Sequence, residues 1–284
     1  MSRHANRLVL LAVAFLFSTG GAAIKATTLT NWQVACFRSA IAGVAVVALV
    51  PSARRRWTRR DLLVALAYAA TMVLYVTANK LTTAANAIFL QSTAPLYLLL
   101  LGPWLLREPL RRADIPLALL VAAGMAMFFA GAQSAAATAP DPMRGNVVAA
   151  VSGVAWALTV AVLRWLGKGA REGVSGMPAV VAGNAIAFLA CLPAAFPVEG
   201  AGAADLAVVA YLGVVQIGLA YALMTYAMRH VPAFEASAVL LAEPAMNPLW
   251  AYLLHGESPG AWAVAGGALI IAATLANAWW HGRR

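Results

Sequence analysis

The fold is decided by Glu235-Ala-Ser-Ala-Val-Leu-Leu-Ala-Glu-Pro-Ala-Met-Asn-Pro-Leu-Trp250, a stretch that continues apolar to Leu254. It has the length and apolar character of a membrane-spanning helix, and it contains an internal carboxylate (Glu243), an amide (Asn247) and two prolines (Pro244 and Pro248). A similar stretch occurs earlier, Asn86-Ala-Ile-Phe-Leu-Gln-Ser-Thr-Ala-Pro-Leu-Tyr97. A shift of 149 residues aligns the two without a gap and places Pro95 on Pro244. The sequence therefore predicts an internal duplication with a proline inside each copy.

The composition is that of an integral membrane protein. Of the 284 residues, 63% are hydrophobic and only 11% are charged, whereas soluble domains average about 25% charged residues. The net charge of +10 would suggest a nucleic-acid partner on a soluble protein. In a membrane protein, basic residues gather in the cytoplasmic loops, so we expect no nucleic-acid partner here.

An all-α membrane protein with ten transmembrane helices is predicted, because about 20 apolar residues are needed per crossing and lipid leaves irregular backbone unpaired. Ten stretches meet this requirement: 8–27, 33–51, 62–79, 84–105, 114–132, 145–166, 177–197, 205–227, 235–254 and 261–280.

The distribution of basic residues predicts the orientation. With a cytoplasmic N-terminus, 16 of the 20 Lys and Arg residues fall on the inside, which places both termini in the cytoplasm. The outside keeps Lys25, Arg38, Lys80 and Arg144. The first three lie near predicted helix ends, where we expect their side chains to snorkel to the interface. A basic ring that attracts a carboxylate at the outer mouth is the alternative.

The ten helices divide into two halves of five. We expect a first repeat at 1–132, an external connecting loop at 133–144 and a second repeat at 145–284. An odd number of helices per repeat inverts the second repeat relative to the first. Inverted-topology repeats are the architecture of many secondary transporters.

The two repeats share a set of motifs. They are Lys80-Leu81, Pro95 and Arg107-Glu108 in the first half, Arg229-His230-Val231-Pro232, Glu243-Pro244 and Gly256-Glu257 in the second, and a closing helix with Gly266-Gly267-Ala268-Leu269-Ile270-Ile271. With these motifs the chain resembles the EamA family of the drug/metabolite transporter superfamily, and within it the YddG-type amino-acid exporters of bacterial inner membranes. The first half departs from the pattern, since Ala94 stands where Glu243 stands in the second half.

Polar and aromatic residues within the spans are the candidates for a substrate path. Buried charges and amides are costly in lipid, so they face the bundle interior or mark function. For Glu243 we consider a substrate-amine anchor, a proton-coupling carboxyl and a structural hydrogen-bonding role. The full candidate set is Tyr75, Asn79, Gln91, Tyr97, Trp156, Gln216, Tyr221, Glu243 and Asn247.

The prolines Pro95, Pro244 and Pro248 are candidate hinges. A proline inside a helix removes one backbone hydrogen bond and frees the carbonyl four residues earlier. Bending at the two repeat-related positions would open and close a gate, and a static bend that improves packing is the alternative.

The functional expectation is a secondary transporter of the bacterial inner membrane. The resemblance implies export of amino acids, with aromatic ones among the candidates, or of related small metabolites. An exporter of drugs or other metabolites and a channel are the alternatives. The sequence has no ATP-binding lysine loop, no zinc-type motif and no catalytic pair within the spans, so we expect no enzyme activity, cofactor or metal. It leaves proton coupling and the oligomeric state open.

Overall fold

A computed structural model describes residues 3–106, 114–131, 134–167, 176–227, 230 and 239–282. Within these ranges the chain forms helices and no strand, and a single isolated bridge joins Ala136 to Ala139. The predicted all-α membrane fold is therefore confirmed at the level of fold class. Among the motif residues, Arg107, Glu108, Arg229, Val231 and Pro232 lie outside the described ranges.

The described part of the first half contains seven α-helices and two short segments of other helical type. They are α1 (Arg3–Ser18), α2 (Gly20–Lys25), α3 (Asn31–Leu49), the 3₁₀ segment η1 (Pro51–Arg54), α4 (Arg59–Leu81), α5 (Ala84–Gln91), α6 (Ala94–Leu101), the π-helical segment η2 (Gly102–Leu106) and α7 (Asp114–Ala130).

The described part of the second half follows a comparable order. It contains α8 (Pro142–Gly167), α9 (Met177–Cys191), the 3₁₀ segment η3 (Leu192–Ala194), α10 (Ala203–Ala210), the π-helical segment η4 (Tyr211–Leu219), α11 (Ala220–Ala227), α13 (Ala242–His255) and α14 (Ala261–Gly282).

Seven helices within the described ranges are long and apolar enough to cross a membrane, which indicates a multi-pass membrane protein. The helices α7 and α14 each contain a shorter apolar segment, Ala118–Ala130 and Ala261–Ala276. The count of ten crossings remains a prediction. The seven long spans are Ala5–Lys25, Asn31–Leu49, Arg59–Leu81, Ala84–Leu105, Pro142–Leu163, Met177–Ala194 and Ala203–Ala227.

Local sequence signals set several helix ends. Thr30 and Thr58 are the N-cap residues of α3 and α4, and each forms a capping box. The threonine hydroxyl accepts a hydrogen bond from the backbone amide three residues later, and the side chain of that later residue accepts one from the threonine amide. Gly256 ends α13 in the left-handed conformation, with φ of 64°. Glycine adopts this conformation without a steric penalty, so the chain can reverse there between α13 and α14.

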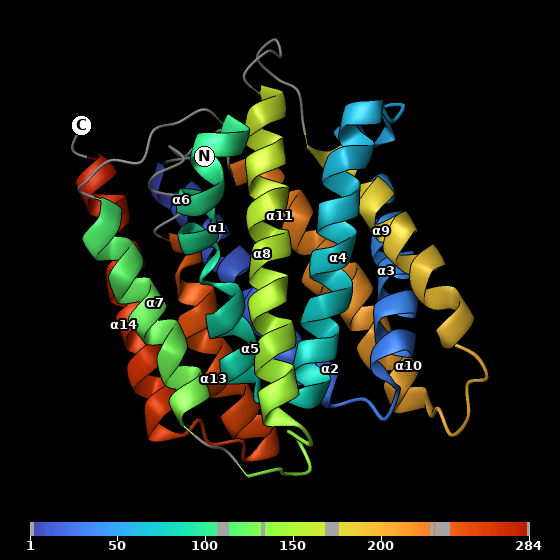
Figure 1. Ribbon diagram of the computed structural model, residues 1–284. Helices are drawn as coiled ribbons and strands as arrows, with labels where there is room; N and C mark the ends of the chain where they lie inside the picture. Colours follow the sequence, from blue (N-terminus) through green and yellow to red (C-terminus); the bar gives the residue numbers. More distant parts are fainter. Residues whose placement is uncertain are drawn as a thin grey trace.

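The two halves pack into one bundle instead of two separate bodies (Figure 1). The helix α4 of the first half contacts α8 and α9 of the second, and α3 contacts α9 and η4. On the other side of the bundle α7 packs along α14, while α1 contacts α11 and α13. The start of α1 and the end of α14 lie at the same end of the bundle in Figure 1.

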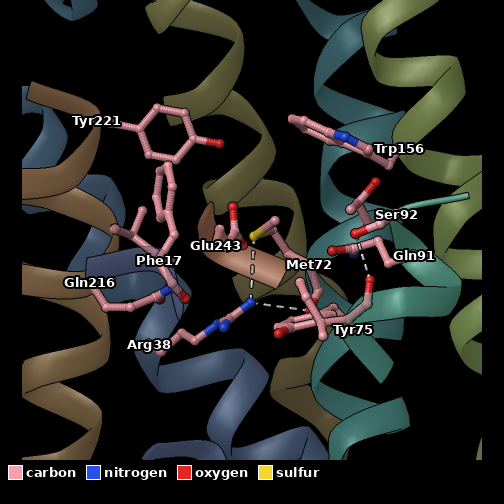
Figure 2. A pocket seen from close by; sticks show the side chains of 13 residues that line it. Phe17, Arg38, Met72, Tyr75, Gln91, Ser92, Trp156, Gln216, Tyr221 and Glu243 are labelled. Carbon is pink, nitrogen blue, oxygen red and sulfur yellow. Dashed lines mark hydrogen bonds between the residues drawn. The ribbon is translucent and has the colours of Figure 1, made fainter. Parts of the chain in front are cut away.

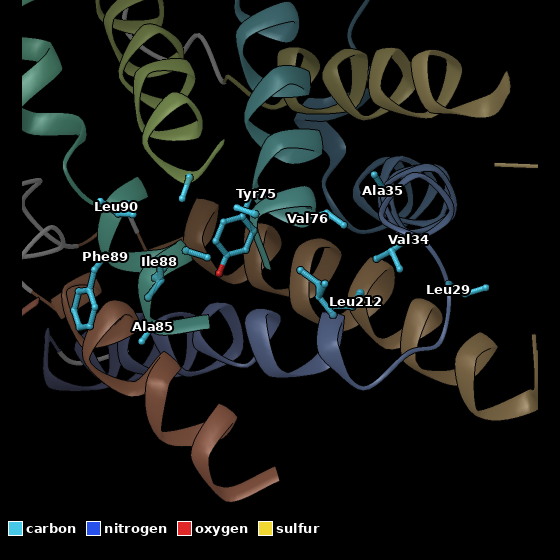
Figure 3. Close-up of a cluster of buried hydrophobic side chains, with 14 of the residues drawn as sticks. Leu29, Val34, Ala35, Tyr75, Val76, Ala85, Ile88, Phe89, Leu90 and Leu212 are labelled. Carbon is cyan, nitrogen blue, oxygen red and sulfur yellow. The ribbon is translucent and has the colours of Figure 1, made fainter. Parts of the chain in front are cut away.

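A buried apolar cluster fills the bundle between α3, α4, α5 and η4 (Figure 3). It contains Ile24, Val34, Val76, Leu90 and Leu212, all buried. Because these residues come from both halves, separating the halves would expose this core.

Two helix interruptions occupy equivalent positions in the two repeats. The turn Ser92-Thr93 separates α5 from α6, and Leu241 is a turn residue directly before α13. The 149-residue shift places Ser92 on Leu241, so the duplication extends to the local backbone. Pro95 and Pro244 both lie in the first turn after the interruption.

This arrangement corrects the expectation that Pro95 and Pro244 kink continuous helices. A proline in the first turn costs no intrahelical hydrogen bond, because the amide it replaces has no partner there. Pro248 lies inside α13, as expected for a kink-forming proline.

Candidate functional site

A cavity lies between the two halves of the bundle (Figure 2). Its volume is about 160 Å³. An engineered protein cavity of about 150 Å³ binds benzene, so this space holds a group of roughly that size. The lining comes from α1, α3, α4, α5, α8, η4, α11 and α13, and consists of Phe17, Arg38, Thr71, Met72, Tyr75, Ile88, Gln91, Ser92, Trp156, Gln216, Ile217, Tyr221 and Glu243.

Six of the nine predicted path residues line this cavity: Tyr75, Gln91, Trp156, Gln216, Tyr221 and Glu243. They come from elements of both halves, namely α4, α5, α8, η4, α11 and α13. The cavity therefore combines aromatic rings, two amides and one carboxylate in a single space.

The two amides are held by neighbouring groups. The Nε2 atom of Gln91 donates to Oγ of Ser152 at 2.8 Å, which joins α5 to α8. The Nε2 atom of Gln216 donates to the Phe17 carbonyl at 3.4 Å, and its Oε1 atom is buried without a hydrogen-bond partner. An unpartnered amide oxygen at a cavity wall is available to accept a hydrogen bond from a bound solute.

Glu243 extends from the first turn of α13 into the cavity (Figure 2). Its carboxylate forms no hydrogen bond or ion pair with any other residue in the described ranges. The first helical turn favours a negative charge, because the free backbone amides point toward it. The hypothesis that this carboxyl is held by a neighbouring helix therefore finds no partner among the described residues.

Arg38 also lines the cavity, although its position near a predicted helix end had suggested a place at the membrane interface. It is 1% exposed and lies in the interior of α3, so its side chain does not snorkel to an interface. Its Nη2 atom donates to the Met72 carbonyl at 3.2 Å and lies 3.4 Å from the Met72 sulfur. The signal that could have found it is that Arg38 is the one charged residue within the apolar stretch 33–51.

Comparison with known proteins places this architecture in a family. A model of the EamA-like transporter family matches the chain twice, at residues 7–130 and 143–279. The chain belongs to the EamA-like transporter family. Its members are membrane transporters and not enzymes, which agrees with the absence of a catalytic pair from the predicted spans.

Solved structures support the same fold for this EamA-like transporter. Sixteen chains from solved structures match this chain, and one of them comes from a crystal structure of a protein. It has 22% sequence identity, a TM-score of 0.62, and 96% of each chain covered. No curated protein matches the chain.

Three predicted path residues of the transporter lie outside the cavity lining. Asn79 and Asn247 are fully buried, and their Nδ2 atoms donate to the backbone carbonyl and the hydroxyl of Tyr75, at 2.9 and 3.3 Å. Both asparagines therefore contact Tyr75, which lines the cavity. Tyr97 does not line the cavity, and its hydroxyl lies 3.5 Å from the sulfur of Met125 on α7.

A second buried polar cluster lies at the end of α2 and in the loop after α13. The ammonium group of Lys25 lies 3.3 Å from the carboxylate of Glu257, and both side chains are buried. Lys25 also donates to the carbonyls of Thr82 and Thr138, while Lys80 donates to the Thr27 carbonyl at 2.6 Å. The expectation that Lys25 snorkels to an interface is wrong, because its side chain is buried and binds Glu257 and backbone carbonyls within the protein. Lys80 is partly exposed, so its interfacial position stays a prediction.

Proposed function

We propose that this EamA-like transporter exports amino acids, with aromatic ones among them, or related small metabolites across the bacterial inner membrane. The observation that carries the proposal is the unpaired Glu243 carboxylate in a cavity walled by aromatic rings. A carboxylate without a protein partner suits a substrate that brings its own ammonium group. Trp156, Tyr221 and Phe17 supply apolar surface for the rest of the solute.

Alternating access requires one end of the cavity to be closed, and we assign this closed end to the side of Asn79, Asn247 and the Lys25–Glu257 pair, whose side chains are all buried. With the predicted ten spans and cytoplasmic termini, this end faces the outside. The structure then corresponds to an outward-closed state, and transport requires this end to open while the opposite end closes.

The helix interruptions at Ser92-Thr93 and Leu241 are the proposed hinges. Backbone at an interruption lacks part of the hydrogen-bond ladder and bends at lower cost than a continuous helix. Each interruption lies beside a cavity residue, since Gln91 and Ser92 adjoin the first and Glu243 follows the second. Rocking of one repeat against the other around a fixed site is the mode of transport that inverted repeats support.

Coupling depends on the same carboxyl. If Glu243 binds an external proton when the substrate leaves and releases it to the cytoplasm, proton entry down its gradient drives export. If it stays ionised throughout, the protein facilitates diffusion. Efflux measured with and without an imposed pH gradient separates the two mechanisms.

The test is transport by the purified protein in proteoliposomes across a panel of amino acids. Saturable efflux of at least one amino acid, abolished by denaturing the protein, is the expected result. Flux of apolar cations without flux of any amino acid would identify a drug exporter instead. Flux of amino acids that does not saturate would identify a channel.

A further inference from the structure

We infer that Arg38 is the carboxylate-binding residue of the cavity, so that Arg38 and Glu243 recognise the two opposite charges of a zwitterionic substrate. This inference deepens the proposed function and rests on it for the ammonium end. It adds a binding residue in α3, a helix that contains none of the predicted path residues. It is supported by the burial of Arg38, by the direction of its side chain and by the absence of a charged partner among the described residues.

Arg38 is the largest of the fully buried side chains and is 1% exposed. A charged side chain within a membrane span is costly because lipid does not solvate its charge. Buried charges are therefore expected to be paired or to bind a ligand. Among the described residues no carboxylate lies within ion-pair distance of the guanidinium, and its Nε atom has no hydrogen-bond partner.

The contacts that Arg38 does make leave its positive charge uncompensated. The Met72 carbonyl accepts from Nη2, but it lies inside α4, where a helical carbonyl already accepts from the amide four residues later. The Met72 sulfur is a weak acceptor. The hydroxyl groups of Tyr68, Tyr75 and Tyr221 lie in the same region, and they are neutral. A carboxylate from outside the chain would supply the missing charge.

The geometry brings the two charged groups to one space without joining them. Figure 2 shows Arg38 from α3 and Glu243 from α13 pointing into the same cavity. They form no ion pair with each other. An α-amino acid placed between them would direct its carboxylate to Arg38 and its ammonium group to Glu243. Its side chain would then lie against the aromatic wall of Trp156 and Tyr221.

The guanidinium group is suited to this role by its shape. Its planar donors match the two oxygens of a carboxylate, and such bidentate bonds are stronger than bonds between neutral groups. Because Nε is unpartnered and buried at the cavity, this side of the fork is available to a ligand. Lysine would keep the charge but lose the bidentate geometry.

The experiment compares three ligands of the same size by titration calorimetry on the purified full-length protein. L-phenylalanine carries both charges, phenylalaninamide lacks the carboxylate, and 3-phenylpropionate lacks the ammonium group. We expect the wild type to bind phenylalanine at least about tenfold more tightly than the amide, since a hydrogen bond to a charged group contributes roughly that factor. Equal affinity for the two ligands in the wild type would overturn the inference.

Variants locate the preference in one residue. In Arg38→Gln the ratio of the affinity for phenylalanine to the affinity for phenylalaninamide should fall to about one. In Arg38→Lys this ratio should fall only partly. Arg144→Gln, at an exposed position near the start of α8, is the matched control and should keep the wild-type ratio. A residue that only stabilises the fold would lower both affinities together and leave their ratio unchanged, which would contradict the inference. If Arg38→Gln does not fold, the inference is tested by the affinities of the wild type and of Arg38→Lys for phenylalanine and phenylalaninamide.

Failure of this inference differs from failure of the proposed function. Binding of 3-phenylpropionate that depends on Arg38, without binding of phenylalanine, would retain the carboxylate site and reject the amino-acid substrate. Phenylalanine binding with no preference over phenylalaninamide would retain the amino-acid substrate and reject Arg38 as the carboxylate-binding residue. No binding of either carboxylate to the wild type would overturn the assignment of Arg38.

Discussion

The Nζ atom of Lys25 lies 3.3 Å from a carboxylate oxygen of Glu257, with the two side chains 2% and 4% exposed. The other carboxylate oxygen accepts from the Ala84 amide at 3.1 Å. One ion pair therefore connects the end of α2, the start of α5 and the loop after α13. It holds elements of both repeats together at the end of the bundle that we propose to be closed.

Breaking this pair should destabilise the protein. Glu257→Gln and Lys25→Met each leave one buried charge without its partner, which costs about 3–5 kcal/mol. The double variant Lys25→Met/Glu257→Gln should recover most of that loss, because it buries no charge and keeps an acceptor for Ala84. Thermal unfolding in detergent measures the effect.

The exposed pair between Arg55 and Asp61 is the control for this measurement. The Arg55 side chain is 45% exposed, so Arg55→Gln should cost at most about 1 kcal/mol. Single variants at Lys25 and Glu257 that melt like the wild type would mean that the ion pair does not hold this end closed.

Neutralising Glu243 should weaken substrate binding. Glu243→Gln keeps the size of the side chain but removes the charge that we propose for the substrate ammonium group, so KM for an amino acid should rise at least about tenfold. Any dependence of transport on pH that arises from this carboxyl should flatten as well. Initial rates in proteoliposomes across several pH values measure both effects.

Glu199→Gln provides the matched control, because Glu199 is exposed and far along the chain from the cavity residues. Unchanged affinity together with an unchanged pH profile in Glu243→Gln would rule out both amine anchoring and proton coupling at this position.

The helix interruptions should matter for the rate of transport more than for binding. Pro95→Ala and Pro244→Ala restore an amide donor, so the flanking helical segments can join into one continuous helix. We expect the maximal transport rate to fall several-fold in each variant, with substrate affinity within about twofold of the wild type. Pro193→Ala, in the exposed segment η3, should leave the rate unchanged. Wild-type rates in both repeat-related variants would show that transport does not bend the chain there.

The contact between α7 and α14 depends on glycine. A Cβ atom on Gly266 would lie 2.6 Å from the backbone oxygen of Gly124, and backbone cannot move aside as a side chain does. Gly266→Ala should therefore lower the stability by about 1–3 kcal/mol. Gly202→Ala is the control, since the nearest atom to its added Cβ lies at 4.0 Å. Equal melting temperatures for Gly266→Ala and the wild type would mean that this helix pair packs more loosely than the structure indicates.

Much of the cavity could be predicted from the sequence, because lipid makes interior polarity costly. Gln91, Gln216 and Glu243 had to face the inside of the bundle, and the structure places all three at one cavity. The same argument cannot separate a cavity wall from a buried contact. Asn79 and Asn247 are just as polar, yet both bind Tyr75 in a packed layer.

The basic residues were the hardest to place from the sequence. Snorkelling predicts an interfacial position for a long cationic side chain near a helix end, unless a partner compensates for its burial. For Lys25 the partner is Glu257, at the far end of the chain, and no local pattern indicates that pairing. For Arg38 the described residues contain no such partner, and only the folded structure shows that it faces the cavity.

Counterflow in proteoliposomes tests the central claim most directly. Vesicles loaded with an unlabelled amino acid and diluted into the same labelled amino acid should take up label transiently, above its equilibrium level. This overshoot requires one binding site that reaches each side in turn. Vesicles that equilibrate the label without an overshoot, whatever amino acid is loaded, would contradict alternating access at this cavity.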